Sequence, residues 1–212
     1  VAKMPEPFNS GQKARHGQRL PAGNEGAGTV VATGDSDMAK ALMGQRVACV
    51  PGTAFSEYAI ADAAMCLPLG DHSAEAGASS FVNPMTALGF VENAKMDGQK
   101  AILHTVGASN LGQMLNRICL EDGMGLVNIV RKEEQAEILR DIGAKHIVNS
   151  TSPTFMEGLI AALMETGATL GFDAIGGGPL AGQLLIAMEA AASRKMKEYS
   201  RYGSGQQTQV FI

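Results

Sequence analysis

Strands and helices alternate without a break from about residue 100 to residue 192, and this alternation restricts the possible folds more than any other feature of the sequence. Apolar runs of strand length separate segments whose apolar residues recur every three or four positions, as in helices. Strands are predicted at 101–106, 125–130, 145–148 and 169–175, and helices at 110–121, 133–142, 155–165 and 180–192. Short connections of this kind favour right-handed crossovers between parallel strands. We therefore expect an α/β fold with a doubly wound, Rossmann-type parallel sheet.

The beginning of the chain follows a different pattern, in which Gly, Asp and Pro separate short β-rich runs. Strands are predicted at 28–32, 45–50 and 55–61, the last because its apolar residues alternate. A helix is expected to begin at Ser73, to run through Ala78 and Val82, and to restart at Pro84. We expect part of a β-barrel domain over residues 1–82 and a dinucleotide-binding domain over residues 83–212.

Both ends of the chain suggest an internal piece of a longer protein. The sequence begins at Val1 without Met and stops at Ile212 inside an apolar run typical of a starting strand. Strand-like pieces are expected near Tyr199 and Val210. On this interpretation the second domain is incomplete at its C-terminal end.

The composition excludes several classes of function. Over 212 residues the net charge is −4 and the charged fraction is 18%, so we expect no electrostatic binding to nucleic acid or to a membrane surface. No apolar run approaches the roughly 20 residues that span a bilayer. The three scattered cysteines (Cys49, Cys66 and Cys119) indicate reduced thiols and therefore a cytoplasmic location.

A loop rich in small residues connects the first strand of the alternating region to its helix. Such a loop lets a pyrophosphate approach the backbone and the N–H groups at the helix start. Ser109 and Asn110 could both cap the helix and donate to phosphate oxygens. An ordinary strand-to-helix turn would also explain the loop. The candidate cofactor-binding residues are Gly107, Ala108, Ser109, Asn110, Leu111 and Gly112.

Two cations, Arg131 and Lys132, follow the second strand of this region. In NAD-selective domains this position holds an acid that binds the ribose hydroxyls, whereas two cations could bind a 2′-phosphate. The alternative is a pair of solvated surface charges, although cations at a helix start oppose the helix dipole. NADPH is therefore the expected cofactor. Gly176 and Gly177, in a run of three glycines, would leave room for it at the fourth strand, unless they form only a flexible turn.

Together these segments resemble zinc-independent medium-chain dehydrogenases/reductases of the quinone oxidoreductase and enoyl reductase type. The resemblance implies a GroES-like catalytic domain beside the Rossmann domain, and a homodimer formed through the Rossmann domain. It also implies that Asn83 and Thr86 lie near the nicotinamide. The segments that carry it are 23–28, 44–47, 55–58, 83–87 and the Rossmann region, including His104 and Thr105.

Departures from the zinc-dependent relatives predict that no metal is bound. Those relatives carry His where this sequence has Asn24, and they carry Cys in the helix that corresponds to residues 79–82. The cysteines are not clustered as in a structural zinc site. The four histidines (His16, His72, His104 and His146) have no metal-ligand spacing and are expected on the surface or in turns. The glycine loop lacks the usual second glycine, so the sequence predicts where a pyrophosphate would bind but not which groups would contact it.

The expected function is hydride transfer from NADPH to a quinone or an activated enone, which are electrophilic enough to need no metal. Asn83, Thr86 and Tyr58 are the candidate catalytic residues, although Asn83 could instead cap a helix and Tyr58 could be a core residue. Without its missing ends, the chain is expected to bind NADPH but to reduce acceptors poorly. The alternative function is a non-catalytic NADPH-binding sensor or structural module. The partner is a small-molecule electron acceptor.

Overall fold

The computed structural model of the chain describes residues 13–198 and 200–212. The chain divides into two compact units, one up to Val82 and one from Asn83 onward. The second unit contains the region of alternating strands and helices. The strand-like piece predicted at Tyr199 lies outside the described residues.

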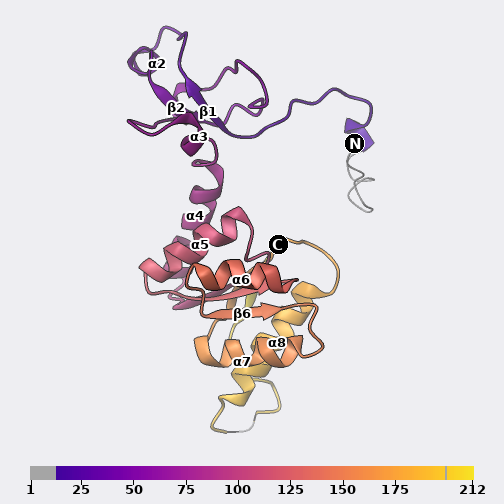
Figure 1. Ribbon diagram of the computed structural model, residues 1–212. Coiled ribbons are helices and arrows are strands. Elements are labelled where there is room, and N and C mark those ends of the chain that lie inside the picture. Colours follow the sequence, from indigo (N-terminus) through magenta and orange to yellow (C-terminus); the bar gives the residue numbers. More distant parts are fainter. Residues whose placement is uncertain (1–12, 199) are drawn as a thin grey trace. The chain divides into compact units, whose positions relative to one another are not determined.

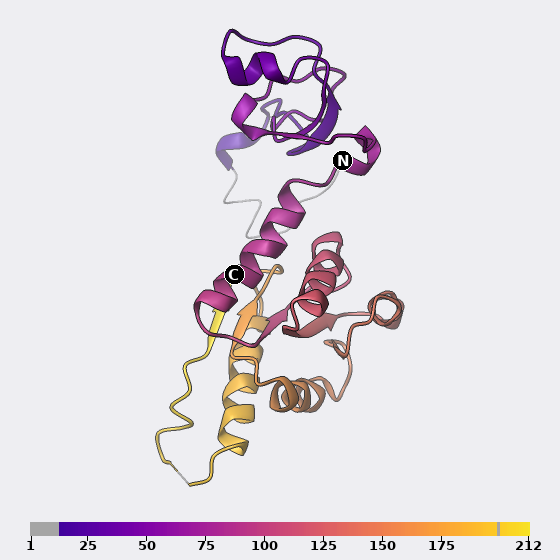
Figure 2. The ribbon, with the colours of Figure 1, turned by 90° about the vertical axis from the view of Figure 1, so that its left-hand side faces the viewer.

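The second unit is built on a five-stranded parallel sheet in the order β6-β5-β4-β7-β8. The chain leaves β4 in one direction to form β5 and β6, then crosses back to β7, and returns after the last helix to β8 (Figure 2). This is the predicted α/β, Rossmann-type arrangement. The strands are β4 (Ala101–His104), β5 (Gly125–Val130), β6 (His146–Asn149), β7 (Leu170–Phe172) and β8 (Gln209–Phe211).

Helices cover both faces of this sheet (Figure 1). Because side chains alternate along a strand, Leu103 of β4 packs toward α7 and α8, and Ile102 packs toward α4 and α5. Both side chains are fully buried, and each such burial contributes about 1.5–3 kcal/mol. The helices are α4 (Val82–Met96), α5 (Asn110–Glu121) and α6 (Glu133–Asp141) on one face, and α7 (Phe155–Thr166) and α8 (Leu180–Arg194) on the other.

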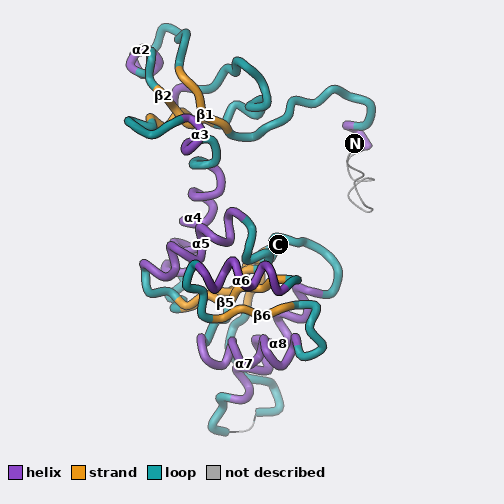
Figure 3. The backbone as a smooth tube through the Cα atoms, in the orientation of Figure 1, coloured by secondary structure: helices purple, strands orange, loops and turns teal. Residues whose placement is uncertain are grey.

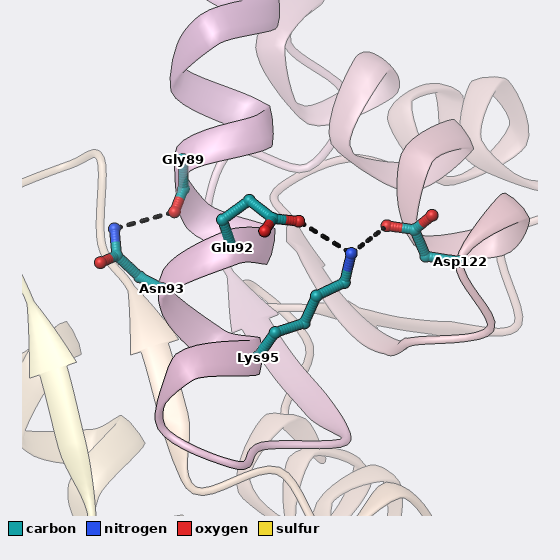
Figure 4. A network of polar contacts seen from close by, with 5 residues as sticks. All are labelled: Gly89, Glu92, Asn93, Lys95 and Asp122. Atoms are coloured by element: carbon teal, nitrogen blue, oxygen red, sulfur yellow. Dashed lines mark hydrogen bonds and ion pairs between the residues drawn. The ribbon is translucent and has the colours of Figure 1, made fainter.

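Polar contacts connect the end of α4 to the end of α5 (Figure 4). The Lys95 ammonium lies 2.8 Å from a carboxylate oxygen of Glu92 and 3.0 Å from one of Asp122, the C-cap residue of α5. On α4 itself, the Asn93 amide donates to the Gly89 carbonyl at 2.8 Å. These groups are solvent-exposed, so they set the local geometry more than they contribute to stability.

The first unit contains a small antiparallel sheet in the order β1-β2-β3, and much of the remaining chain is loop (Figure 3). Ser73 caps a short helix by accepting from the Ala76 N–H, as its position at the predicted helix start suggested. The GroES-like identity of this unit stays a prediction. Its elements are η1 (Lys13–Arg15), β1 (Gly26–Thr29), α2 (Asp37–Ala41), β2 (Arg46–Cys49), η2 (Ala63–Met65), β3 (Cys66–Pro68) and α3 (Ala74–Gly77).

The strand predicted at 55–61 is wrong. This segment is a loop, and its apolar side chains Phe55, Tyr58 and Ile60 are 84%, 76% and 96% exposed. Alternation predicts a strand only if one face becomes buried, and here neither face does. The Ser56 hydroxyl instead donates to the carbonyls of Thr53 and Tyr58, which favours a turn. The exposure of Tyr58 also rules out a core role for this residue.

Two further boundaries differ from the prediction. The helix that begins after Ser73 ends at Gly77, and a separate helix, α4, begins at Val82 rather than at Pro84. Pro84 is tolerated within the first turn because N–H groups there have no partner inside the helix. In the described part of the chain, the helices are too short or too polar to cross a membrane.

Candidate functional site

A cavity of about 190 Å³ lies in the second unit, where the chain leaves β4, β5, β6 and β7. In open α/β sheets ligands bind at the carboxyl ends of the strands, where the strand order reverses. A larger hollow of about 360 Å³ lies along β6 and α7 at the sheet edge, and its lining comes only from residues 145–165, not from β4, where the strand order reverses. The smaller cavity is therefore the candidate site. Its lining consists of Val106, Ala108, Ser109, Ile129, Val130, Arg131, Gln135, Ser150 and Ile175.

Close packing requires glycine at both ends of the loop between β4 and α5. A Cβ atom added at Gly107 would lie 2.9 Å from the Asn128 Oδ1 atom and 3.0 Å from the Asn128 Cβ atom. At Gly112 an added Cβ would clash with the carbonyl group of Gly107. The Gly107 N–H donates to the Ile129 carbonyl at 2.9 Å, which holds the loop against β5. The loop therefore presents backbone rather than side chains.

Ser109 forms the N-cap of α5. Its hydroxyl accepts from the Gly112 N–H at 3.1 Å, and the Gln113 amide donates to the Ala108 carbonyl at 2.9 Å. Asn110 and Leu111 open the helix without lining the cavity. N–H groups in a first turn have no acceptor within their helix and can bind an anion.

Val106 adopts a strained backbone conformation at the entrance to this loop. Its φ angle is +55°, in the left-handed region that β-branched residues rarely occupy. Such conformations cost about 1–3 kcal/mol and gather at ligand sites. The predicted strand 101–106 hid this feature, because β4 ends at His104. A valine in an apolar run gives no signal of a positive φ angle.

Arg131 lines the cavity, and its guanidinium could pair with an anionic group of a ligand. Its backbone N–H donates to the Gln135 side chain at 3.0 Å, whereas its side chain is exposed. Glu133, a nearby acid, lies 2.7 Å from Arg140 instead. Within residues 13–198 and 200–212, Arg131 and Lys132 have no ion-pair partner. Lys132 precedes α6 but does not line the cavity.

A buried polar pair joins the ends of β4 and β7. The Thr105 hydroxyl donates to Asp173 Oδ1 at 2.9 Å, and both residues are buried. The backbone N–H of Ala174 donates to the Thr105 hydroxyl at 2.8 Å, and that of Ile175 donates to Asp173 Oδ1 at 3.0 Å. This arrangement fixes the loop that reaches the cavity through Ile175. A polar residue near the end of an otherwise apolar strand run is the sequence signal that each of them carries, but only the strand order shows that the two meet.

The glycine run after Asp173 adopts conformations that favour glycine. The φ angles of Gly176, Gly177 and Gly178 are +59°, +132° and +64°. These residues form the turn between β7 and α8, and Ile175, rather than Gly176 or Gly177, lines the cavity. Their contact with a cofactor stays a prediction.

His104 contradicts its predicted place on the surface or in a turn. Its side chain is 1% exposed on β4, and neither ring nitrogen has a hydrogen-bond partner within the described part of the chain. The ring lies 5.9 Å from that of Phe90, which stacks on Phe172. Burial lowers the pKa of His104 to about 4, against an opposing effect of Asp173. The prediction failed because helices cover both faces of this central strand.

Among the other histidines, His16 and His72 are exposed and His146 is half-buried.

The three candidate catalytic residues do not line the cavity. Tyr58 belongs to the first unit, whereas Asn83 and Thr86 lie half-buried near the start of α4. The helix-cap interpretation of Asn83 is wrong, because the helix already begins at Val82. A Glu25 carboxylate oxygen accepts from the N–H groups of Phe81 at 3.0 Å and Val82 at 2.7 Å.

Over residues 13–198 and 200–212, no three His, Cys, Asp or Glu side chains gather as metal ligands would.

Comparison with known proteins finds that the chain is similar to reductases. No family model matches. A probable quinone oxidoreductase of Leishmania amazonensis is 28% identical over 158 residues, which are 73% of this chain and 45% of that protein. Prostaglandin reductase-3 of Mus musculus is 27% identical over 157 residues, which are 73% of this chain and 41% of that protein.

A solved structure gives the same result at higher identity. The crystal structure of a protein assigned as an NADPH:quinone reductase, from Mesorhizobium loti, has 40% sequence identity and a TM-score of 0.73. The match covers 80% of this chain and 50% of that one. The chain thus spans about half the length of the relatives it matches. These relatives and the parallel sheet agree, and over the matched residues the chain is similar to quinone oxidoreductases of the medium-chain dehydrogenase/reductase type.

Proposed function

We propose that this chain binds NADPH at the carboxyl ends of its parallel strands and acts in the reduction of a quinone or an activated enone without zinc. The observation that carries this proposal is the cavity that brings together Ser109, Arg131 and Ser150. These residues come from the loops that follow β4, β5 and β6. The similarity to a protein named as an NADPH:quinone reductase supports the choice of cofactor and acceptor.

The shape of the site fits the phosphate-bearing part of NADPH. Gly107 and Gly112 keep side chains away from the loop, so a pyrophosphate could approach the backbone and the start of α5. The cavity of about 190 Å³ is smaller than the roughly 300–1,000 Å³ typical of complete ligand sites. It would therefore hold only the adenosine end of the cofactor.

The charge at the site favours NADPH over NADH. The strand β5 ends at Val130 and is followed by Arg131, where NAD-selective domains have an acid. A guanidinium can make paired hydrogen bonds to a 2′-phosphate. Lys132 could contribute at longer range, and the Ser150 hydroxyl, which donates to the Val130 carbonyl at 3.1 Å, can still accept.

Bound NADPH supplies the hydride, and the protein has to hold the nicotinamide and the acceptor in a productive orientation. Thr105 and Asp173 would fix the loop beside the cofactor through their hydrogen bonds. Asn83, Thr86 and Tyr58 remain the proposed residues for orienting the reacting groups.

Zinc independence rests on Asn24, because an amide is a poor substitute for the histidine ligand of the zinc enzymes. A cytoplasmic location and a homodimer through the Rossmann domain belong to the same proposal.

Replacement of Arg131 by Ala tests the proposal. Loss of a charge-assisted contact to the 2′-phosphate should weaken NADPH binding by about 1–3 kcal/mol. The affinity for NADH should hardly change, because NADH lacks that phosphate. Fluorescence titration of the nicotinamide measures both affinities. Consumption of NADPH with any member of a panel of quinones and enones would then identify a reductase rather than a module that only binds.

Arg117→Ala provides a matched control, because Arg117 is an exposed cation on α5 that does not line the cavity. This variant should bind both cofactors like the unmodified chain. Equal losses for NADPH and NADH in Arg131→Ala would show that Arg131 does not recognise the 2′-phosphate. NADPH binding at some other place would leave Arg131→Ala without effect and refute the site.

A further inference from the structure

Two of the three cysteines lie opposite each other on neighbouring strands of the sheet in the first unit. Cys49 ends β2 and Cys66 begins β3, and the antiparallel register places them directly opposite. Their separation in the sequence concealed this relationship. Cys119 lies elsewhere, buried on α5.

The type of this cross-strand pair follows from the neighbouring backbone hydrogen bonds. The Leu69 N–H donates to the Arg46 carbonyl at 2.9 Å, so Arg46 and Leu69 form a hydrogen-bonded pair. Because pair types alternate along an antiparallel ladder, Cys49 and Cys66, three positions further, form a non-hydrogen-bonded pair. Pro68, which has no N–H, also occupies a non-hydrogen-bonded position, as the same alternation requires.

A non-hydrogen-bonded pair suits a disulfide. Its Cα atoms lie about 4.5 Å apart and its side chains approach each other closely. Disulfides join Cα atoms separated by roughly 4.4–6.8 Å. A bond between Cys49 and Cys66 would therefore need no rearrangement of the strands.

Both thiols are open to small reagents. Each cysteine is half-exposed, and the Cys66 thiol donates to the Asp62 carbonyl at 3.3 Å. Burial raises the pKa of both thiols, with further increases from Cys66 at Cys49 and from Asp62 at Cys66. Thiol–disulfide exchange at neutral pH should consequently be slow, so the extent of oxidation should be measured after equilibrium is reached. Full burial raises the pKa of Cys119 to about 12, so it can serve as an unreactive internal reference.

We propose that Cys49 and Cys66 form a dithiol site that is reversibly oxidised to a cross-strand disulfide by exchange with glutathione disulfide. One cysteine thiolate attacks the glutathione disulfide, forming a mixed disulfide and releasing one glutathione thiolate. The second cysteine, as its thiolate, then attacks the sulfur of the first, and the second glutathione leaves as a thiolate. The two cysteines lose two electrons and two protons, and glutathione disulfide gains them.

The bond would close the loop of residues 50–65 at its base. This loop carries the exposed side chains Phe55, Tyr58 and Ile60 and has no strand of its own. A crosslink at its ends restricts the conformations open to it. Tyr58, a proposed catalytic residue, would thus come under redox control. The dithiol itself depends only on β2 and β3, so it stands or falls separately from the proposed function.

Peptide mapping of the full chain tests the site. The chain is equilibrated in graded mixtures of reduced and oxidised glutathione, acid-quenched, alkylated with N-ethylmaleimide and digested with trypsin. Both cysteines fall within the peptide Val47–Lys95, which contains no internal Lys or Arg. We expect this peptide to lose two hydrogen atoms, to resist alkylation, and to recover both thiols with dithiothreitol. Further cleavage after Glu57 should leave two fragments joined by the disulfide.

Single variants decide between a disulfide and independent oxidation. Cys49→Ser should leave Cys66 as a mixed disulfide with glutathione, whereas Cys119→Ser should form the same internal disulfide as the unmodified chain. Separate glutathione adducts on Cys49 and Cys66 in the unmodified chain would overturn the proposal. So would two alkylated thiols after equilibration in fully oxidised glutathione. Both readouts use the unmodified chain, so they hold even if a variant fails to fold.

Discussion

At the scale of single residues, His104 is a neutral imidazole held away from water at the end of a central strand. Its folded-state pKa of about 4 lies below its ordinary value of 6.5. Protonation therefore favours the unfolded chain. The resulting stability is complete above pH 6.5 and is lost as the pH falls from 6.5 toward 4.

This dependence can be separated from other titrations by the variant His104→Leu. Between pH 7.5 and pH 5, the free energy of unfolding of the unmodified chain should fall by about 2 kcal/mol more than that of the variant, since one pKa unit is worth about 1.4 kcal/mol. Urea denaturation at each pH provides the measurement. Parallel pH profiles of the two proteins would mean that His104 is not buried in its neutral form.

Thr105 is the second residue whose role can be measured directly. Thr105→Val keeps the shape but leaves the Ala174 N–H without its acceptor and removes one of the two donors to Asp173 Oδ1, the Ile175 N–H being the other. The expected loss is about 1–3 kcal/mol in the free energy of unfolding. Thr105→Ser retains the hydroxyl and should recover most of that loss. If the two variants were equally destabilised, the methyl group rather than the hydrogen bonds would be responsible.

At the scale of elements, α4 begins with a carboxylate supplied from far away in the sequence. Glu25 accepts from the N–H groups of Phe81 and Val82, where the helix dipole also favours a negative charge. Glu25→Ala should cost about 1–2 kcal/mol in the free energy of unfolding, as loss of a cap does. Circular dichroism during urea denaturation follows the loss. Glu25→Gln keeps an acceptor oxygen without the charge, so its free energy of unfolding should lie between those of the unmodified chain and Glu25→Ala. If both variants were as stable as the unmodified chain, the capping role would be contradicted.

At the scale of the whole molecule, the sheet of the second unit has an open edge at β8, since none of the strands formed by residues 13–198 and 200–212 pairs with its outer side. Gln209 donates to Thr169 and Phe211 accepts from Asp173, so both direct their backbone groups toward β7. The N–H and carbonyl of Val210 therefore point to the open edge. An edge of this kind can pair with a second chain, which is how the proposed homodimer could form.

Val210→Pro removes the outward N–H without affecting the bonds to β7. Sedimentation at micromolar concentration should show dimers of the unmodified chain and monomers of this variant. Phe211→Ser, which leaves the backbone donors in place, serves as the control and should still dimerise. A dimer that persists in Val210→Pro would place the interface elsewhere.

The sequence by itself determined the architecture of the second unit. Buried parallel strands read as continuous apolar runs, and amphipathic helices repeat every three or four residues, so both signals are local. The helix α5 and the strand β5 have the predicted bounds, 110–121 and 125–130. The glycine loop and Arg131 were also identifiable, because each directly follows a predicted strand.

Only the tertiary structure decided which side chains meet. The segment of residues 55–61 alternates like a strand but lies exposed, because nothing among the described residues buries one of its faces. His104 became buried because helices pack on both faces of β4, and Cys49 met Cys66 because of the register between β2 and β3. Thr105 and Asp173 came together because β4 and β7 are neighbours in the sheet although 68 positions separate the two residues. Burial, register and strand order are properties of contacts between distant segments, and no local pattern of residues encodes them.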